Sequence, residues 1–124
     1  MKPILKEIIE DIWKAIEQYK GELVLVEGKN DRAALESLGF NRVHSINANM
    51  PSYEIVEGIK EKKVLILTDL DKEGKQIYAR LRKDLEKRGV IIDDTLRHLL
   101  FKTELRQIEG LSHYLQRLSY EQEK

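Results

Sequence analysis

The chain has 124 residues, of which 41% are hydrophobic, so it fits one domain with a substantial core and is short for two. Its 22 basic and 22 acidic side chains cancel, which excludes the broad electrostatic attraction of a strongly basic nucleic-acid binder. The absence of cysteine excludes disulfides, thiolate catalysis and cysteine-ligated metal centres.

Residues 3–19 are predicted to form an amphipathic helix. Its apolar positions recur at helical spacing and are Ile4, Leu5, Ile8, Ile9, Ile12, Trp13 and Ile16. We expect this stripe to pack on the domain's own sheet. The alternative is a homodimer or a protein partner bound through this helix, because the stripe carries a tryptophan that a small sheet does not need to cover.

The next four segments alternate between strand and helix. Residues 23–26 form an unbroken apolar run, which is typical of a central parallel strand covered on both faces. Residues 31–38 are predicted to be a helix, 43–46 a weaker strand, and 51 to about 60 a helix introduced by proline.

The second half of the chain continues the alternation. Residues 64–68 are the strongest strand, and a long helix follows over about 73–88. Residues 90–93 are a strand or a connection, and 96–101 are predicted to be the last strand. A C-terminal helix is expected over about 104–120, and a start at Ile108 is favoured over a start at Glu104.

This alternation predicts a Rossmann-like α/β fold, a three-layer sandwich with helices on both faces of a roughly four-stranded, mostly parallel sheet. The core is expected over about residues 22–102, with the N-terminal helix added. The sequence has no internal repeat and no linker, so we expect residues 1–124 to form a single domain.

Two of the predicted strands end in acidic residues: Glu27 follows the first, and Asp69 and Asp71 follow the third. If these strands are neighbours, their carboxyl ends meet at one edge of the sheet, where sites form in open parallel sheets. Three converging carboxylates repel one another and favour a divalent cation. Oxygen ligands without histidine or cysteine indicate Mg²⁺, or Mn²⁺ as a substitute. Taken singly, each motif is more often a solvated turn.

Both acidic motifs resemble those of a known family. The segment VEGKND at residues 26–31 resembles the E-G-x-x-D element of toprim domains, and LTDLDKEG at residues 67–74 resembles their D-x-D element. The similarity is closest to the nuclease that matures ribosomal 5S RNA and to small stand-alone toprim proteins, and it extends to bacterial primase catalytic domains. A toprim fold is what this resemblance implies.

The resemblance also implies roles for the acids. Asp69 and Asp71 are expected to hold Mg²⁺, and Glu27 is expected to act as a general acid or base at a phosphodiester while also contacting the metal. A metal neutralises charge on phosphate oxygens, and a carboxylate beside two others has a raised pKa that suits proton transfer.

Residues around the acids have expected supporting roles. The candidates for phosphate binding are Lys29, Lys72 and Lys75, and those for tight turns are Gly28 and Gly74. Asp31 is either a second acid of the site or a helix cap. A further substrate path is predicted along Arg97, His98, Lys102 and Arg106.

Three functions remain open from the sequence. The first is Mg²⁺-dependent phosphodiester chemistry on RNA or DNA, as a ribonuclease-like RNA-processing hydrolase or a primase-like nucleotidyl transferase. The second is a non-catalytic toprim module that binds nucleic acid or a partner in DNA replication, recombination or repair. The third is a domain that handles small nucleotides. No apolar run approaches the roughly 20 residues of a membrane span, so we expect a cytoplasmic protein without membrane contact.

Overall fold

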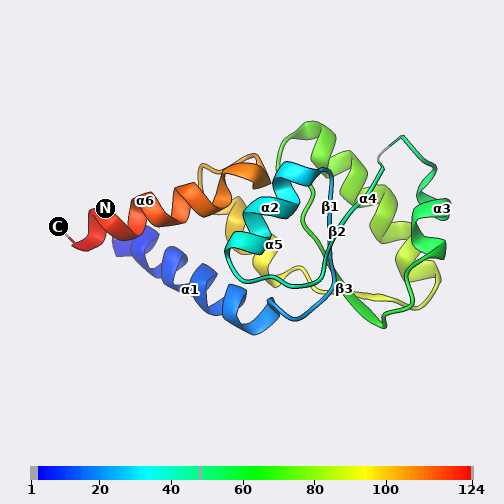
Figure 1. Ribbon diagram of the computed structural model, residues 1–124, viewed down its shortest axis with the longest axis horizontal. Coiled ribbons are helices and arrows are strands. Elements are labelled where there is room, and N and C mark those ends of the chain that lie inside the picture. Colours follow the sequence, from blue (N-terminus) through cyan, green and yellow to red (C-terminus); the bar gives the residue numbers. More distant parts are fainter. Residues whose placement is uncertain (1–2, 48, 124) are drawn as a thin grey trace.

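The computed structural model describes residues 3–47 and 49–123, and its helices and strands form three layers (Figure 1). In chain order the elements are α1 (Pro3–Tyr19), β1 (Val24–Val26), α2 (Lys29–Ser37), β2 (Val43–Ser45), α3 (Ser52–Glu57), β3 (Lys63–Ile66), α4 (Lys72–Lys87), β4 (Ile91–Ile92), α5 (Thr95–Phe101), the 3₁₀ helix η1 (Ile108–Gly110) and α6 (Leu111–Glu123). In the described part of the chain, no helix is long and apolar enough to cross a membrane.

The four strands form one parallel sheet in the order β2-β1-β3-β4. Val24 of β1 aligns with Val43 of β2 on one side and with Leu65 of β3 on the other. The predicted parallel α/β sheet is confirmed. The two strands that precede the acidic motifs are therefore direct neighbours at the centre, and their carboxyl ends open at the same edge.

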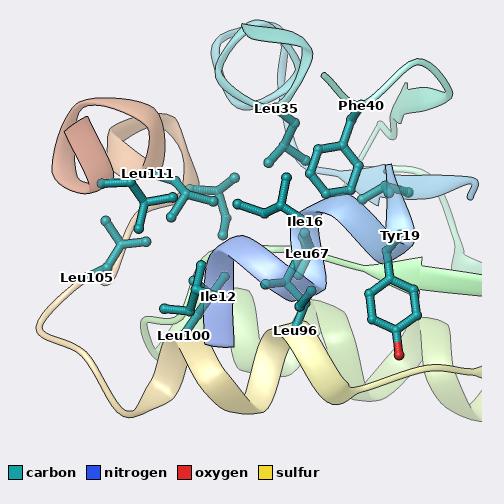
Figure 2. Close-up of a cluster of buried hydrophobic side chains, with 14 of the residues drawn as sticks. Ile12, Ile16, Tyr19, Leu35, Phe40, Leu67, Leu96, Leu100, Leu105 and Leu111 are labelled. Carbon is teal, nitrogen blue, oxygen red and sulfur yellow. The ribbon is translucent and has the colours of Figure 1, made fainter. Parts of the chain in front are cut away.

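Strand residues alternate between two buried faces. Val24 and Val26 of β1 and Leu65 of β3 face a core shared with α1, α2, α5 and α6, whereas Leu25 and Ile66 face a core shared with α3 and α4. Figure 2 shows the larger of these cores, where side chains from α1, α2, α5 and the loop after β3 converge. Burial on both faces explains why the central strands are unbroken apolar runs.

The predicted N-terminal helix is present as α1, and its apolar stripe is used inside the domain. Ile9, Ile12 and Ile16 are almost completely buried in the larger core, and α1 packs against α5. Trp13 stays 37% exposed and Ile4 70% exposed. Most apolar side chains of α1 are therefore buried within the domain. A homodimer or a protein partner bound through α1 remains a prediction.

The prediction of a last strand at 96–101 is wrong, because these residues form helix α5 and the fourth strand is β4 instead. Leu96 and Leu100, one helical turn apart, are fully buried in the larger core. The segment LRHLLF is short enough to be read as a strand or a helix, and its apolar positions at 96, 99 and 100 follow the helical spacing.

One helix boundary differs from the prediction: the helix expected from 51 to about 60 ends at Glu57, followed by Gly58. Of the two starts considered for the C-terminal helix, the structure agrees with Ile108, because residues 104–107 are irregular and η1 begins at Ile108 directly before α6. This irregular segment runs beside the loop after β3, where the amide of Leu70 donates to the carbonyl of Arg106 at 2.8 Å.

Candidate metal centre

The two acidic motifs are joined by a hydrogen bond between the ends of the central strands. The amide of Asp69, just after β3, donates to Oε2 of Glu27, just after β1, at 2.7 Å. Both side chains are partly buried. The structure therefore brings together the two acids that lie 42 residues apart in the sequence.

The turn after β3 folds back tightly on itself. Asp71 is the N-cap of α4, with its Oδ1 accepting from the amide of Gly74 at 2.8 Å. The hydroxyl of Thr68 donates to the carbonyl of Gly74 at 2.7 Å. A Cβ atom at position 74 would lie 1.9 Å from the carbonyl oxygen of Asp69, so only glycine fits there.

The turn after β1 leaves more space around its glycine than the turn after β3 does. Gly28 has an extended backbone (φ −149°, ψ 176°), and a Cβ there would meet nothing closer than Oδ2 of Asp31 at 3.9 Å. The chain's own geometry therefore does not require glycine at position 28, in contrast to position 74. Asp31 has the expected capping contact, because its Oδ2 accepts from the amide of Gly28 at 3.1 Å.

An acidic cavity of about 380 Å³ opens at this edge of the sheet. Its lining consists of Glu27, Gly28, Lys29, Asn30, Asp31, Asp69, Gln107 and Glu109. Asp71 is not part of this lining and lies two residues after Asp69 in the turn. Four carboxylates therefore share the cavity, of which one, Glu109, was missed by sequence reasoning.

Glu109 comes from η1, 40 positions after Asp69, and belongs to neither motif. Its place is set by the adjacent residue, because the amide of Ile108 donates to Oδ1 of Asp69 at 2.9 Å. A lone Glu-Gly pair carries no local signal of this contact, so only the tertiary structure identifies Glu109 as part of the site.

Burial and mutual repulsion raise the pKa values of the acids in the cavity. Burial is the main cause for Glu27, opposed by the bond from the Asp69 amide and reinforced by the charges of Asp69, Asp31 and Asp71. Burial likewise raises the pKa of Asp69, with Asp71 and Glu109 adding to the effect. Burial, together with the charge of Asp69, raises the pKa of Asp31 to about 6.

The donor chemistry of these acids suits a hard divalent cation. Glu27, Asp31, Asp69 and Asp71 each use one carboxylate oxygen to accept a backbone amide, which leaves the second oxygen as a ligand. Within residues 3–47 and 49–123, no three His, Cys, Asp or Glu side chains already form a metal-binding group. The carboxylates are thus gathered at one edge, while the final coordination geometry is not preformed.

The predicted lysines surround this edge and are exposed. Lys29 lines the cavity, and Lys72 and Lys75 lie on the first turn of α4 beside Asp71. The ammonium of Lys75 lies 5.4 Å from the centroid of the Phe101 ring, which links the start of α4 to α5.

Arg97 does not lie on an open substrate path as predicted. Its side chain is buried, with 3% of the residue exposed. Nη1 donates to the carbonyl of Thr68 at 2.7 Å, and Nη2 donates to the carbonyl of Asp69 at 3.2 Å. The guanidinium therefore binds the protein's own backbone beneath the acidic site.

Comparison with known proteins gives one domain family and several relatives. The sequence profile of the toprim domain matches residues 21–94. A UPF0292 protein of Methanocaldococcus jannaschii is 31% identical over 119 residues, which cover 88% of this chain and 93% of the relative. A UPF0292 protein of Pyrococcus abyssi is 29% identical and covers 91% of this chain and 88% of its own.

A solved structure is also similar. A protein from Aquifex aeolicus superimposes with a TM-score of 0.67 at 30% sequence identity, covering 86% of this chain and 96% of its own. The profile match at residues 21–94 contains both acidic motifs, whereas Arg97 and Glu109 lie beyond it.

We predict that Gly74→Ala destabilises the protein strongly, because its methyl group would collide with the Asp69 carbonyl. The melting temperature should fall by at least ~5 °C, as expected when a fixed backbone is overpacked. Gly21→Ala is the control, because a Cβ there meets nothing within 4 Å, and it should melt close to the wild type. Equal melting temperatures for the two variants would contradict the close approach in this turn.

A pH dependence follows from the raised pKa of Asp31. Between the ordinary value of 3.8 and about 6, the folded protein retains a proton that the unfolded chain has lost. The free energy of unfolding of the metal-free protein should therefore fall as the pH rises through this window. Asp31→Asn should flatten that slope, measured by thermal melts with a chelator present. The same slope in both proteins would show that Asp31 titrates alike in its folded and unfolded states.

Proposed function

Since the chain belongs to the toprim domain family, we propose that it is a Mg²⁺-dependent nuclease that uses Glu27, Asp69 and Asp71 to hydrolyse phosphodiester bonds. Toprim membership associates the chain with metal-dependent nucleic-acid function, and toprim domains generally bind divalent metals such as Mg²⁺. The observation that carries the proposal is the 2.7 Å hydrogen bond between the Asp69 amide and the Glu27 carboxylate. It unites both acidic motifs in one site.

Asp69 and Asp71 are the proposed metal ligands. Their backbone positions are fixed by the close approach of Gly74 and by two amide hydrogen bonds, and each keeps one carboxylate oxygen for a cation. A bound Mg²⁺ would stabilise negative charge on the phosphate oxygens and promote ionisation of a water molecule. The oxygen-only donor set favours Mg²⁺ or Mn²⁺ over Zn²⁺.

Glu27 is the proposed proton carrier, with a share in the metal site. Burial and the neighbouring acids raise its pKa, which brings the carboxyl closer to the pH at which it can both take up and release a proton. Its hydrogen bond to the Asp69 amide uses Oε2, so Oε1 is the oxygen proposed to carry the proton. The role of Glu27 therefore follows from its burial and from the charges of the acids beside it.

Local positive charge is the proposed means of holding the nucleic acid. The net charge of zero gives no long-range attraction, so binding depends on lysines close to the acids. Lys29 at the cavity, and Lys72 and Lys75 on the first turn of α4, are exposed and suited to phosphate contacts. RNA is the first substrate to test, because the motifs resemble those of the 5S RNA maturation nuclease.

Electrostatics favours the enzyme over a metal-free binding module. A cavity lined by four carboxylates repels a phosphate backbone unless a cation is present. A module that only bound nucleic acid would gain from neutral or basic residues at these positions. The exposed Trp13 and Ile4 on α1 still leave a protein-binding role as the second candidate.

The proposal is tested by incubating the purified protein with Mg²⁺ and a panel of structured RNA and DNA substrates. Glu27→Gln, Asp69→Asn and Asp71→Asn should each lower the cleavage rate by at least ~100-fold, because each removes a group from the reacting centre. Glu36→Gln is the control, since this exposed acid on α2 pairs with Arg32 and lies outside the lining of the acidic cavity. It should cleave at the wild-type rate.

The outcome also separates the alternatives. Cleavage that survives Asp69→Asn would refute the assigned site. Absence of cleavage on every substrate, together with no specific Mg²⁺ binding by calorimetry, would favour the binding module. Nucleotidyl transfer in place of hydrolysis would keep the site and change the reaction class.

A further inference from the structure

Arg97 is a buried charge without a carboxylate partner. Only 3% of the residue is exposed, and no acidic oxygen in residues 3–47 or 49–123 lies within 4.0 Å of its guanidinium nitrogens. Burying an unpaired charge is costly unless hydrogen bonds replace its water. The acceptors of the Arg97 hydrogen bonds therefore indicate the role of this residue.

Backbone carbonyls next to the acidic residues accept the hydrogen bonds that replace water around the Arg97 guanidinium. It donates to the carbonyls of Thr68 and Asp69 at 2.7 and 3.2 Å, and its contact with the carbonyl of Ile66 is longer, at 3.5 Å. These carbonyls belong to the end of β3 and the turn after it. A planar fork of donors matches two such acceptors at once, which an ammonium group cannot do.

Two aromatic rings hold the guanidinium in this position. Its central carbon lies 4.4 Å from the centroid of Tyr78 and 5.2 Å from the centroid of Phe101. The Tyr78 hydroxyl is fixed in turn by hydrogen bonds with Asp94 and Arg82. Phe101 also lies beneath the ammonium of Lys75. The arginine is thus clamped from α4 and α5 while it holds the end of β3.

We propose that Arg97 is the positioning residue of the acidic site, whose guanidinium fixes the Thr68–Asp69 backbone so that the Asp69 and Asp71 carboxylates are held ready for a divalent cation. The inference rests on the proposed metal site and adds a residue that neither acidic motif contains. Arg97 does not contact substrate in this scheme. It acts through the turn that it binds.

The positive charge of Arg97 has a second effect on the same turn. It lies near enough to Asp69 to lower the pKa of that carboxyl, against the raising effects of burial, Asp71 and Glu109. A fixed internal cation thereby offsets part of the repulsion among the acids before any metal binds. A lysine at position 97 would keep the positive charge and lose the paired hydrogen bonds of the guanidinium. Arg97→Lys therefore separates the effect of the charge from the effect of the hydrogen bonds.

The test compares Arg97→Lys with Arg117→Lys. Arg117 is an exposed arginine of α6 outside the clamp, and its central carbon lies 5.7 Å from the centroid of the Tyr114 ring. Two quantities are measured: hydrogen exchange of the Asp69, Gly74 and Ile108 amides in metal-free protein, and the Kd for Mn²⁺ by electron paramagnetic resonance. Each of these amides donates to a carboxylate of the site.

Arg97→Lys should speed exchange of the three amides by ~10-fold or more while the amides of residues 24–26 keep their protection, because the loss is local. It should weaken Mn²⁺ binding by at least ~10-fold, as losses around a metal's ligands usually do. Arg117→Lys should change neither quantity by more than ~2-fold, which is within the scatter of a surface change.

Wild-type exchange and Mn²⁺ affinity in Arg97→Lys would overturn the proposal, as would faster exchange spread equally over residues 24–26. If Arg97→Lys does not fold, the same measurements are made on Phe101→Leu, which removes one aromatic ring beside the guanidinium and keeps the arginine. Wild-type exchange of the three amides in Phe101→Leu would then refute the positioning role of Arg97. A wild type that binds no Mn²⁺ defeats the proposed metal function, whereas the exchange pattern still decides the role of Arg97.

Discussion

The hydrogen bond between the Asp69 amide and the Glu27 carboxylate is the interaction on which the site depends. It exists because β1 and β3 are neighbouring parallel strands in fixed register, so their carboxyl ends meet at one edge. The helices on both faces serve this arrangement by burying all of β1 and Val64, Leu65 and Ile66 of β3. A one-residue slip of either strand would exchange its two faces and separate the acids.

Gathering carboxylates at one edge creates a repulsion that the fold must offset. Backbone amides donate to one carboxylate oxygen each of Glu27, Asp31, Asp69 and Asp71, and the buried guanidinium of Arg97 binds the turn after β3. Burial, with the charges of the neighbouring acids adding to its effect, still raises the pKa values of Glu27 and Asp69. A divalent cation would neutralise the remaining negative charge of the carboxylates. The repulsion that destabilises the metal-free site therefore favours metal binding.

Sequence patterns predicted the parts of this protein that are local. The central strands are unbroken apolar runs, and the acids follow them directly, so both the sheet and the convergence of Glu27 with Asp69 were foreseeable. The segment at 96–101 was not, since a short buried helix and a short buried strand share the same apolar composition. Glu109 and the buried role of Arg97 depend on contacts across 28 to 40 positions, which no pattern of neighbouring residues encodes.

The central claim is that Asp69, Asp71 and Glu27 together hold a divalent cation. A crystal structure of the protein soaked with Mn²⁺, with anomalous diffraction data, tests it most directly. The account predicts an anomalous peak contacted by carboxylate oxygens of Asp69 and Asp71, with Glu27 beside it and Arg97 still bound to the backbone of the turn. Ordered acidic side chains without a peak at saturating Mn²⁺, or a cation bound only elsewhere on the protein, would contradict it.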